Sequence, residues 1–188
     1  MPSELIVDVF LSVDGWAGSD GLPGYFGYPG PELERWIAAE GAAPQLVLMG
    51  RVTYATLAGL PEEVRDEGWD RLTQLEKVVF SRTLSEATWA NTRICAGPLV
   101  DEVRALKASS EVPLRTVGSL SVARQLQSAG LVDRLRLMMF PLIAGPAGRE
   151  AAFHGMASAD LEVADHRLLD GRLLLVEYRP TGHDIPRA

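Results

Sequence analysis

An α/β fold with a mixed sheet is predicted by three patterns in the sequence. Short apolar segments of strand character alternate along most of the chain with segments whose apolar residues recur at helical spacing. Several strand segments are followed at once by a glycine or hydroxyl residue and the start of a helix. The last two strand segments instead flank Asp170-Gly171, a dipeptide typical of β-hairpins. We therefore expect strands joined by helices, with an antiparallel hairpin at one edge of the sheet.

The predicted strands share β-branched and large apolar residues, and polar residues, glycine or proline bound them. They cover residues 5–13, 46–49, 77–81, 91–95, 113–117, 131–143, 161–169 and 172–178. The first ends in the turn sequence Ser12-Val13-Asp14-Gly15. In the sixth, Arg134 and Arg136 alternate with leucines, as expected for a strand with one polar face.

The predicted helices begin at residues suited to a helix N-terminus, and glycine ends several of them. Pro31 opens the first helix, and Gly41 is expected to end it. Ser119 is expected to cap a helix over residues 120–129. The remaining helices are expected to start at Arg51, to lie within residues 61–75 and to start at Pro98.

One domain over residues 1–180 and a loose tail at 181–188 are expected from a chain of 188 residues without repeat or linker. The net charge of −7, from 18 basic and 25 acidic residues, argues against a nucleic-acid-binding surface, which needs clustered basic side chains.

The single cysteine, Cys95, is expected to be a buried structural thiol and fits a reducing compartment. Because we find neither a signal peptide nor an apolar run of the ~20 residues that a membrane span needs, we expect a cytoplasmic protein without a membrane partner.

Glycines, hydroxyl residues and arginines gather at three predicted strand ends. These residues are Gly50, Arg51 and Thr53; Ser81, Arg82 and Thr83; and Gly118, Ser119 and Leu120. Each group alone is also typical of an ordinary strand–helix connection with a solvated arginine. Helix starts present unpaired N–H groups and a positive dipole end, which suit a phosphate. Since ligands of α/β sheets bind outside the carboxyl ends of the strands, the three groups are expected to meet there.

A loop dense in glycine and aromatic residues joins the first strand to the first helix. Trp16, Tyr25 and Phe26 in this loop, with Trp36 in the helix, suit the wall or lid of a pocket, although a loop that merely packs on the domain would have the same composition. Two arginines beside one nucleotide suggest an extra phosphate, as on a 2′-phosphorylated ribose. A dinucleotide beside an aromatic loop suggests hydride transfer to a small ring or sugar.

Other reaction classes lack their sequence signatures. We find no nucleophile elbow, no Walker loop and no Gly-x-Gly-x-x-Gly fingerprint. His154, His166 and His183 lie far apart in the sequence without the spacing of metal ligands, so no metal site is expected.

The spacing of these segments resembles the dihydrofolate-reductase-like superfamily. The likeness is greatest to stand-alone bacterial relatives of the C-terminal reductase domain of riboflavin-biosynthesis deaminase/reductases. The matching motifs run through nearly the whole chain: Ser12-Val-Asp-Gly15, Met49-Gly-Arg-Val-Thr-Tyr54, Lys77-Val-Val-Phe-Ser-Arg-Thr83, Val117-Gly-Ser119 and Gly130-Leu-Val-Asp-Arg-Leu-Arg-Leu137, with Pro141 and Gly145. The resemblance implies a three-layer α/β fold with a mixed, mainly parallel sheet of about eight strands, an antiparallel C-terminal hairpin and helices on both faces. It also implies a homodimer that associates through sheet-edge elements.

The resemblance further implies NADPH as the cofactor, bound across the strand ends. The residues that would bind it are Val9, Phe10, Gly50, Arg51, Thr53, Ser81, Arg82, Thr83, Gly118, Ser119 and Leu120. Of these, Ser81 and Arg82 match the segment that grips the 2′-phosphate, and Val9 and Phe10 match positions near the nicotinamide. The residues expected on the substrate side are Asp14, Trp16, Tyr25, Phe26, Glu32 and Trp36.

The activity implied is NADPH-dependent reduction of a carbonyl or imine carbon in a heterocycle-linked substrate. The first candidate is the ribosylamino-pyrimidine intermediate of riboflavin synthesis. Dihydrofolate reductases carry an acid in the first helix, and here Glu32 or Glu34 would take its place, so Glu32 or water is the candidate proton donor. The turn after Val117 has a single glycine where the family often has two or three. A dihydrofolate or pterin reductase and a non-catalytic nucleotide-binding or structural dimer are the alternatives.

Overall fold

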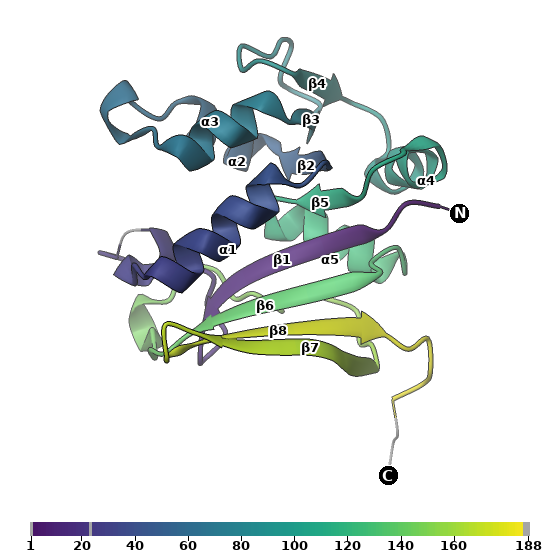
Figure 1. Ribbon diagram of the computed structural model, residues 1–188. Helices are drawn as coiled ribbons and strands as arrows, with labels where there is room; N and C mark the ends of the chain where they lie inside the picture. Colours follow the sequence, from purple (N-terminus) through teal and green to yellow (C-terminus); the bar gives the residue numbers. More distant parts are fainter. Residues whose placement is uncertain (1, 23, 186–188) are drawn as a thin grey trace.

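The computed structural model describes residues 2–22 and 24–185. In this part of the chain, eight strands form one sheet in the order β4-β3-β2-β5-β1-β6-β8-β7 (Figure 1). The strands are β1 (Leu5–Ser12), β2 (Leu46–Gly50), β3 (Glu76–Phe80), β4 (Thr92–Cys95), β5 (Leu114–Thr116), β6 (Arg134–Phe140), β7 (Leu161–Leu169) and β8 (Leu173–Pro180). Strands β1 to β6 pair in parallel, whereas β8 pairs antiparallel with both β6 and β7. The predicted mixed, mainly parallel sheet with an antiparallel C-terminal hairpin is confirmed.

Helices cover both faces of this sheet. They are α1 (Pro31–Ala42), α2 (Arg51–Ala58), α3 (Glu67–Gln74), α4 (Leu99–Ser109) and α5 (Leu120–Ser128), with short 3₁₀ turns η1 (Gly24–Gly27), η2 (Glu62–Val64) and η3 (Gly145–Ala147). In β2, Leu48 packs in the cluster that includes α4 and α5, whereas Met49 packs in the cluster of α2 and α3. Successive strand residues point to opposite faces, so these two clusters lie on opposite sides of the sheet. Helix α1 contacts α3 and lies on the same side of the sheet as α2 and α3.

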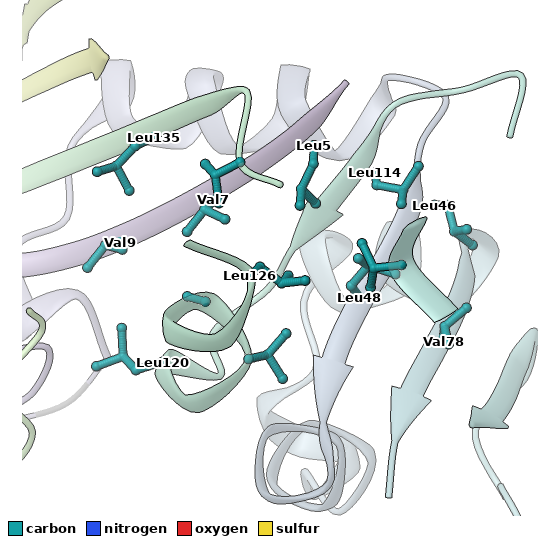
Figure 2. Packing of buried hydrophobic residues seen from close by; sticks show 14 of the residues in the cluster. Leu5, Val7, Val9, Leu46, Leu48, Val78, Leu114, Leu120, Leu126 and Leu135 are labelled. Atoms are coloured by element: carbon teal, nitrogen blue, oxygen red, sulfur yellow. The ribbon is translucent and has the colours of Figure 1, made fainter. Parts of the chain in front are cut away.

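The larger apolar cluster holds α5 against the middle of the sheet. Leu5 and Val7 of β1, Leu48 of β2 and Leu114 of β5 surround Leu126 of α5, and all five are almost fully buried (Figure 2). Burying one such side chain stabilises the fold by about 1.5–3 kcal/mol. This packing fixes the start of α5 beside the ends of β2 and β5.

Several predicted boundaries differ from the observed ones by one to three residues, and two of these differences have a clear physical reason. Helix α1 does not stop at Gly41 but ends after Ala42, where Ala43 takes extended angles (φ −70°, ψ 136°). Ala43 precedes Pro44, and the proline ring disfavours the helical conformation in the residue before it. Strand β6 covers Arg134–Phe140 and not all of residues 131–143. Its expected first residues connect α5 to the sheet, since the N–H of Leu131 donates to Leu126 O and that of Asp133 to Leu5 O.

The hairpin and the buried thiol are confirmed. Asp170 and Gly171 take positive φ angles of 51° and 64°, the conformation that the Asp-Gly pair predicts for a tight hairpin turn. Cys95 ends β4 as a buried thiol. The expected tail, 181–188, falls partly outside the described residues, and Thr181 at its start donates hydrogen bonds to the carbonyl and the carboxylate of Asp160.

Candidate functional site

The three residue groups that the sequence places at strand ends lie side by side in the structure. They follow β3, β2 and β5, which are consecutive in the sheet and parallel. Gly50 at the end of β2 pairs with Phe80, the residue before Ser81. The three strand ends therefore meet at the carboxyl ends of neighbouring parallel strands, as expected.

The hydroxyl of Ser119 joins two of these strand ends. It accepts a hydrogen bond from the backbone N–H of Gly50 (2.8 Å) and shares another with the hydroxyl of Thr53 (2.6 Å). Ser119 therefore does not cap α5 with its side chain, contrary to our expectation. It occupies the cap position in the left-handed conformation (φ 60°, ψ 61°), which turns its hydroxyl toward α2. We call this arrangement of Gly50, Thr53 and Ser119 the Ser119 latch.

Gly118 allows the latch to close. It takes a positive φ of 58°, and a Cβ atom placed on it would lie 3.0 Å from Cγ2 of Thr53. A larger residue would crowd the side chain of Thr53 and would be strained at this φ angle. The helices begin there with Arg51 and Leu120, so their unpaired first-turn N–H groups and positive dipole ends are held close together.

The third strand end provides a tight turn and an arginine. The hydroxyl of Ser81 accepts hydrogen bonds from the N–H groups of Thr83 and Leu84, at 3.2 and 2.9 Å. Arg82 is exposed at the turn, and Arg51 is exposed at the start of α2. Within residues 2–22 and 24–185 neither arginine takes part in a salt bridge.

Two residues expected to bind the cofactor have side chains that are buried in the core. Val9 is 2% exposed and Leu120 is 8% exposed, and both belong to the apolar cluster under α4 and α5. Their contribution to a ligand site is therefore limited to their backbone atoms. Phe10, the neighbour of Val9, points to the opposite face and packs near α1.

Aromatic side chains gather around Phe10 on that face. Its ring centroid lies 5.3 Å from that of Tyr25, 6.1 Å from that of Trp36 and 6.2 Å from that of Phe140. Phe26 packs on Phe140 at 5.4 Å. The structure thus brings together three of the four aromatic residues expected on the substrate side. Phe140 was missed, because inside a long apolar strand nothing distinguishes it from a core residue.

The backbone of Tyr25 and Phe26 is strained. Both take left-handed angles, with φ of 54° and 52°, between Gly24 and Gly27. For residues other than glycine this conformation costs roughly 1–2 kcal/mol each. The burial of Phe26 against Phe140 offsets this cost, while Tyr25 remains 45% exposed at the surface of the aromatic group.

Trp16 and Asp14 lie in a different place from the aromatic group. The Trp16 ring lies against Gly148, where a Cβ atom would overlap it, and its backbone forms a bridge with Ala151. Trp16 is thus not part of the expected aromatic wall. The carboxylate of Asp14 accepts hydrogen bonds from the hydroxyl of Ser12 and the N–H groups of Ala144 and Gly145, which lower its pKa to about 2. Asp14 joins the loop after β1 to the segment after β6.

Glu32 is engaged in a structural contact and does not face the aromatic group. Its carboxylate accepts a hydrogen bond from the N–H of Asp170 in the hairpin turn. The carboxylate of Asp170 in turn accepts hydrogen bonds from the N–H groups of Glu32 (2.9 Å) and Leu33 (3.0 Å), so it caps α1. A Cβ atom on Gly30 would overlap the Asp170 carboxylate. The expectation that Glu32 serves the substrate is not supported by this geometry.

Four charged side chains, none more than 27% exposed, lie beneath Trp36, and the polar face of β6 was their only signal in the sequence. Asp8 binds Arg115 at 2.5 Å and Arg136 at 2.6 Å, and Glu40 of α1 lies 2.7 Å from Arg136 and 3.5 Å from Arg115. The guanidinium groups lie 5.7 and 5.2 Å from the centroid of the Trp36 ring. This closed set of ion pairs ties α1 to β1, β5 and β6. It thereby fixes the aromatic residues of α1 over the sheet.

His154, His166 and His183 are all exposed. Among the residues described, no three His, Cys, Asp or Glu side chains come together in a way that would hold a metal ion. In the same part of the chain, no helix has the length and apolar character needed to cross a bilayer.

With this geometry in view, the chain can be compared with known proteins. The family model of the RibD C-terminal domain matches residues 3–175. No curated protein matches the chain. A solved structure of a Shewanella sp. PV-4 protein assigned to riboflavin biosynthesis is similar, with a TM-score of 0.70 and 19% identity over 96% of this chain and 99% of that one.

Two further structures share the fold. One is a diaminohydroxyphosphoribosylaminopyrimidine deaminase/5-amino-6-(5-phosphoribosylamino)uracil reductase from Thermotoga maritima, with a TM-score of 0.66 and 14% identity over 95% of this chain and 57% of that one. The other is the dihydrofolate reductase of Enterococcus faecalis in complex with NADP(H). It has a TM-score of 0.61 and 14% identity over 95% of this chain and 96% of that one. The expected dihydrofolate-reductase-like fold is confirmed, although identities this low establish nothing finer than the fold.

Proposed function

Because this chain belongs to the RibD C-terminal domain family, we propose that it is an NADPH-dependent reductase of a heterocycle-linked substrate. The first candidate substrate is 5-amino-6-(5-phosphoribosylamino)uracil or a close ribosylamino-pyrimidine, by analogy with the Thermotoga maritima protein. The observation that carries the proposal is the Ser119 latch, with two exposed arginines beside it.

The residues at the strand ends fit a phosphorylated dinucleotide. Gly118 leaves room for the side chain of Thr53, which lets the first turns of α2 and α5 lie close together. The first turns of α2 and α5 add N–H donors there. Arg51 and Arg82 provide two planar guanidinium groups without salt bridges in the described part of the chain, which suits a 2′-phosphate and favours NADPH over NADH.

In the reaction, the protein's part is to bind, orient and exclude water. NADPH, when bound, supplies the hydride. Phe10 and exposed Tyr25 offer apolar faces on which a flat heterocycle can pack, and the buried rings of Phe26 and Phe140 support them from below. Holding the cofactor and the substrate in one orientation lowers the activation barrier, because their translational and rotational entropy is already lost on binding. Since Glu32 is bound to the hairpin turn, we assign the proton to water.

A dihydrofolate or pterin reductase is the less favoured alternative. Such an enzyme needs a free acid in the first helix to bind and protonate the pterin ring. Here the carboxylate of Glu32 binds the N–H of Asp170, and Glu34 is exposed to solvent. A non-catalytic nucleotide-binding protein is the alternative of another class, and activity measurements separate it from the reductase.

Cofactor binding can be tested by titrating the wild type and the Arg51→Ala variant with NADPH and NADH, followed by nicotinamide fluorescence. A charged hydrogen bond is worth about 1.5–3 kcal/mol, so we expect NADPH binding to weaken roughly tenfold or more in the variant, with NADH binding little changed. Arg93→Ala is the matched control, because Arg93 is an exposed arginine on β4. Equal losses for both cofactors would show that Arg51 does not bind the 2′-phosphate.

Turnover can be tested by following NADPH oxidation with ribosylamino-pyrimidine, pterin and dihydrofolate substrates. The proposal requires oxidation with the pyrimidine. Binding of NADPH without oxidation of any substrate would support the non-catalytic alternative, and methotrexate-sensitive oxidation with dihydrofolate would support the pterin alternative. Absence of NADPH binding would refute the proposal altogether.

A further inference from the structure

Three Asp-Gly pairs occur in the sequence, and this dipeptide is chemically able to rearrange its own main chain. The pairs are Asp14-Gly15, Asp20-Gly21 and Asp170-Gly171. The backbone nitrogen of the glycine can attack the Cγ atom of the preceding aspartate, because glycine has no side chain that hinders the approach. The attack requires a carboxyl group that is free to turn toward that nitrogen. The surroundings of each aspartate therefore decide whether the pair reacts.

The carboxylate of Asp14 is held in place by three hydrogen bonds. It accepts one from the hydroxyl of Ser12 at 2.6 Å. It accepts two more from the N–H groups of Ala144 and Gly145, at 2.9 and 2.8 Å. These bonds lower the pKa of Asp14 to about 2, which disfavours the protonated carboxyl group that reacts. The N–H of Gly15 donates to Ser12 O at 2.9 Å, so the attacking nitrogen is engaged as well.

The carboxylate of Asp170 is also held. One of its oxygens accepts a hydrogen bond from the N–H of Glu32 at 2.9 Å, and the other accepts from the N–H of Leu33 at 3.0 Å. Rotation of this carboxylate toward Gly171 would break both bonds and uncap α1.

Asp20 has no such restraint. Its side chain is 79% exposed, and among the described residues its carboxylate meets only Arg149, at 3.3 Å, which is itself 64% exposed. An exposed ion pair of this kind restrains its partners little. In the same part of the chain, the N–H of Gly21 donates no hydrogen bond, and no atom lies within 4 Å of the place where a Cβ would stand on Gly21. Both reacting groups are therefore free at this pair.

Asp20 also lies where a change of the main chain matters. Residues 15–20 run beside residues 147–152, and the N–H of Ala17 donates to Glu150 O and that of Asp20 to Ala147 O, each at 2.8 Å. Asp20 is the last residue of this paired segment, and the chain continues from it to Tyr25 in the aromatic group. An extension of the main chain at Asp20 would therefore fall between a fixed segment and the ring of Tyr25.

We propose that Asp20 is a site of spontaneous conversion to isoaspartate, and that the conversion displaces Tyr25 from the aromatic group. The nitrogen of Gly21 bonds to Cγ of the protonated Asp20 carboxyl group, and one carboxyl oxygen leaves as water together with the amide proton. Water then opens the resulting succinimide at the former main-chain carbonyl of Asp20, so that the chain runs through Cγ and is longer by one methylene group. The reaction needs no oxidant, reductant or cofactor. The inference is independent of the proposed reductase activity.

The test is a peptide map of the wild-type protein after several weeks at neutral pH and body temperature. Trypsin releases residues 1–35 as one peptide, because Arg35 is the first basic residue, so positions 14 and 20 are compared within the same molecules. Electron-transfer fragmentation and methylation by an isoaspartate-specific methyltransferase identify the product. We expect isoaspartate at residue 20 to exceed that at residues 14 and 170 at least about tenfold, because the other two carboxylates must first lose charged hydrogen bonds.

The same incubation in urea is the control for sequence effects. The unfolded chain has none of these hydrogen bonds, so the three pairs should then react at similar rates. Equal amounts of isoaspartate at the three positions of the folded protein, or none at residue 20, would overturn the proposal.

Asp20→Glu tests the effect on Tyr25, because its longer side chain would have to close a larger ring and keeps the charge. We expect the aged variant to retain its near-ultraviolet circular dichroism, and the aged wild type to lose aromatic signal in proportion to the isoaspartate formed. An aged wild type with an unchanged aromatic spectrum would refute the displacement of Tyr25.

Discussion

Replacement of Ser119 by alanine tests how the two helix starts at the strand ends are held together. The change removes an acceptor for the N–H of Gly50 at 2.8 Å and a partner for the hydroxyl of Thr53 at 2.6 Å. The left-handed backbone conformation of residue 119 would remain, but alanine forms no hydrogen bond that offsets its cost.

The magnitude follows from these contacts. A hydrogen bond contributes about 1 kcal/mol net, so losing two should lower the free energy of unfolding by about 2 kcal/mol. Glycine at position 119 loses the same bonds but adopts a φ of 60° without the cost of roughly 1–2 kcal/mol that other residues incur. We therefore expect Ser119→Gly to be more stable than Ser119→Ala by about 1 kcal/mol.

Urea unfolding of the wild type and both variants measures these differences, and NADPH titration of the same proteins measures the effect on the site. Ser121→Ala is the matched control, because Ser121 is an exposed serine in the first turn of α5. We expect that control to unfold like the wild type. An alanine variant as stable as the wild type, or more stable than the glycine variant, would refute the latch.

Two further predictions concern the contacts of the loops. Gly30→Ala should break the cap of α1, because the new Cβ would overlap the Asp170 carboxylate. We expect the free energy of unfolding, measured in urea, to fall by about 1–3 kcal/mol. Gly18→Ala is the control, because the nearest atom to its Cβ is 3.9 Å away, and it should lower the free energy of unfolding by less. The pKa of Asp14 lies at about 2, below its ordinary value of 3.8, so its contribution to stability is complete above pH 3.8 and is lost as the pH falls through 2. The stability difference between the wild type and Asp14→Asn, measured by thermal unfolding, should therefore shrink from pH 5 to pH 2, and a difference independent of pH would contradict the assigned hydrogen bonds.

Several elements were predictable because their signals are local. The pair Asp170-Gly171 favours two successive residues with positive φ angles, as in a tight hairpin turn. Pro31 favours the first position of a helix whatever residues surround it. The strand ends that carry Gly50, Ser81 and Gly118 were expected to meet because parallel strands place their carboxyl ends on one side of the sheet, where ligands bind. Their recurrence, and not any one of them, pointed to a phosphate site.

The parts that failed depend on contacts between distant residues. Glu32 and Asp170 are 138 positions apart, and nothing in either segment announces that the hairpin turn caps α1. The same holds for Trp16, which packs against Gly148, and for Arg136, which alternates with leucines as a solvated strand residue would and yet is buried against Asp8 and Glu40.

The sequence by itself determined the alternation of strands and helices and the residue types at each strand end, because propensity, turn chemistry and apolar periodicity act within a few residues. Only the tertiary structure decided where the polar side chains point. Ser119 has a hydroxyl that suits its own helix, but the left-handed backbone beside Gly118 turns that hydroxyl toward Gly50 and Thr53. A side chain's partner is fixed by the packing of the whole sheet, and the packing is not written in any single segment.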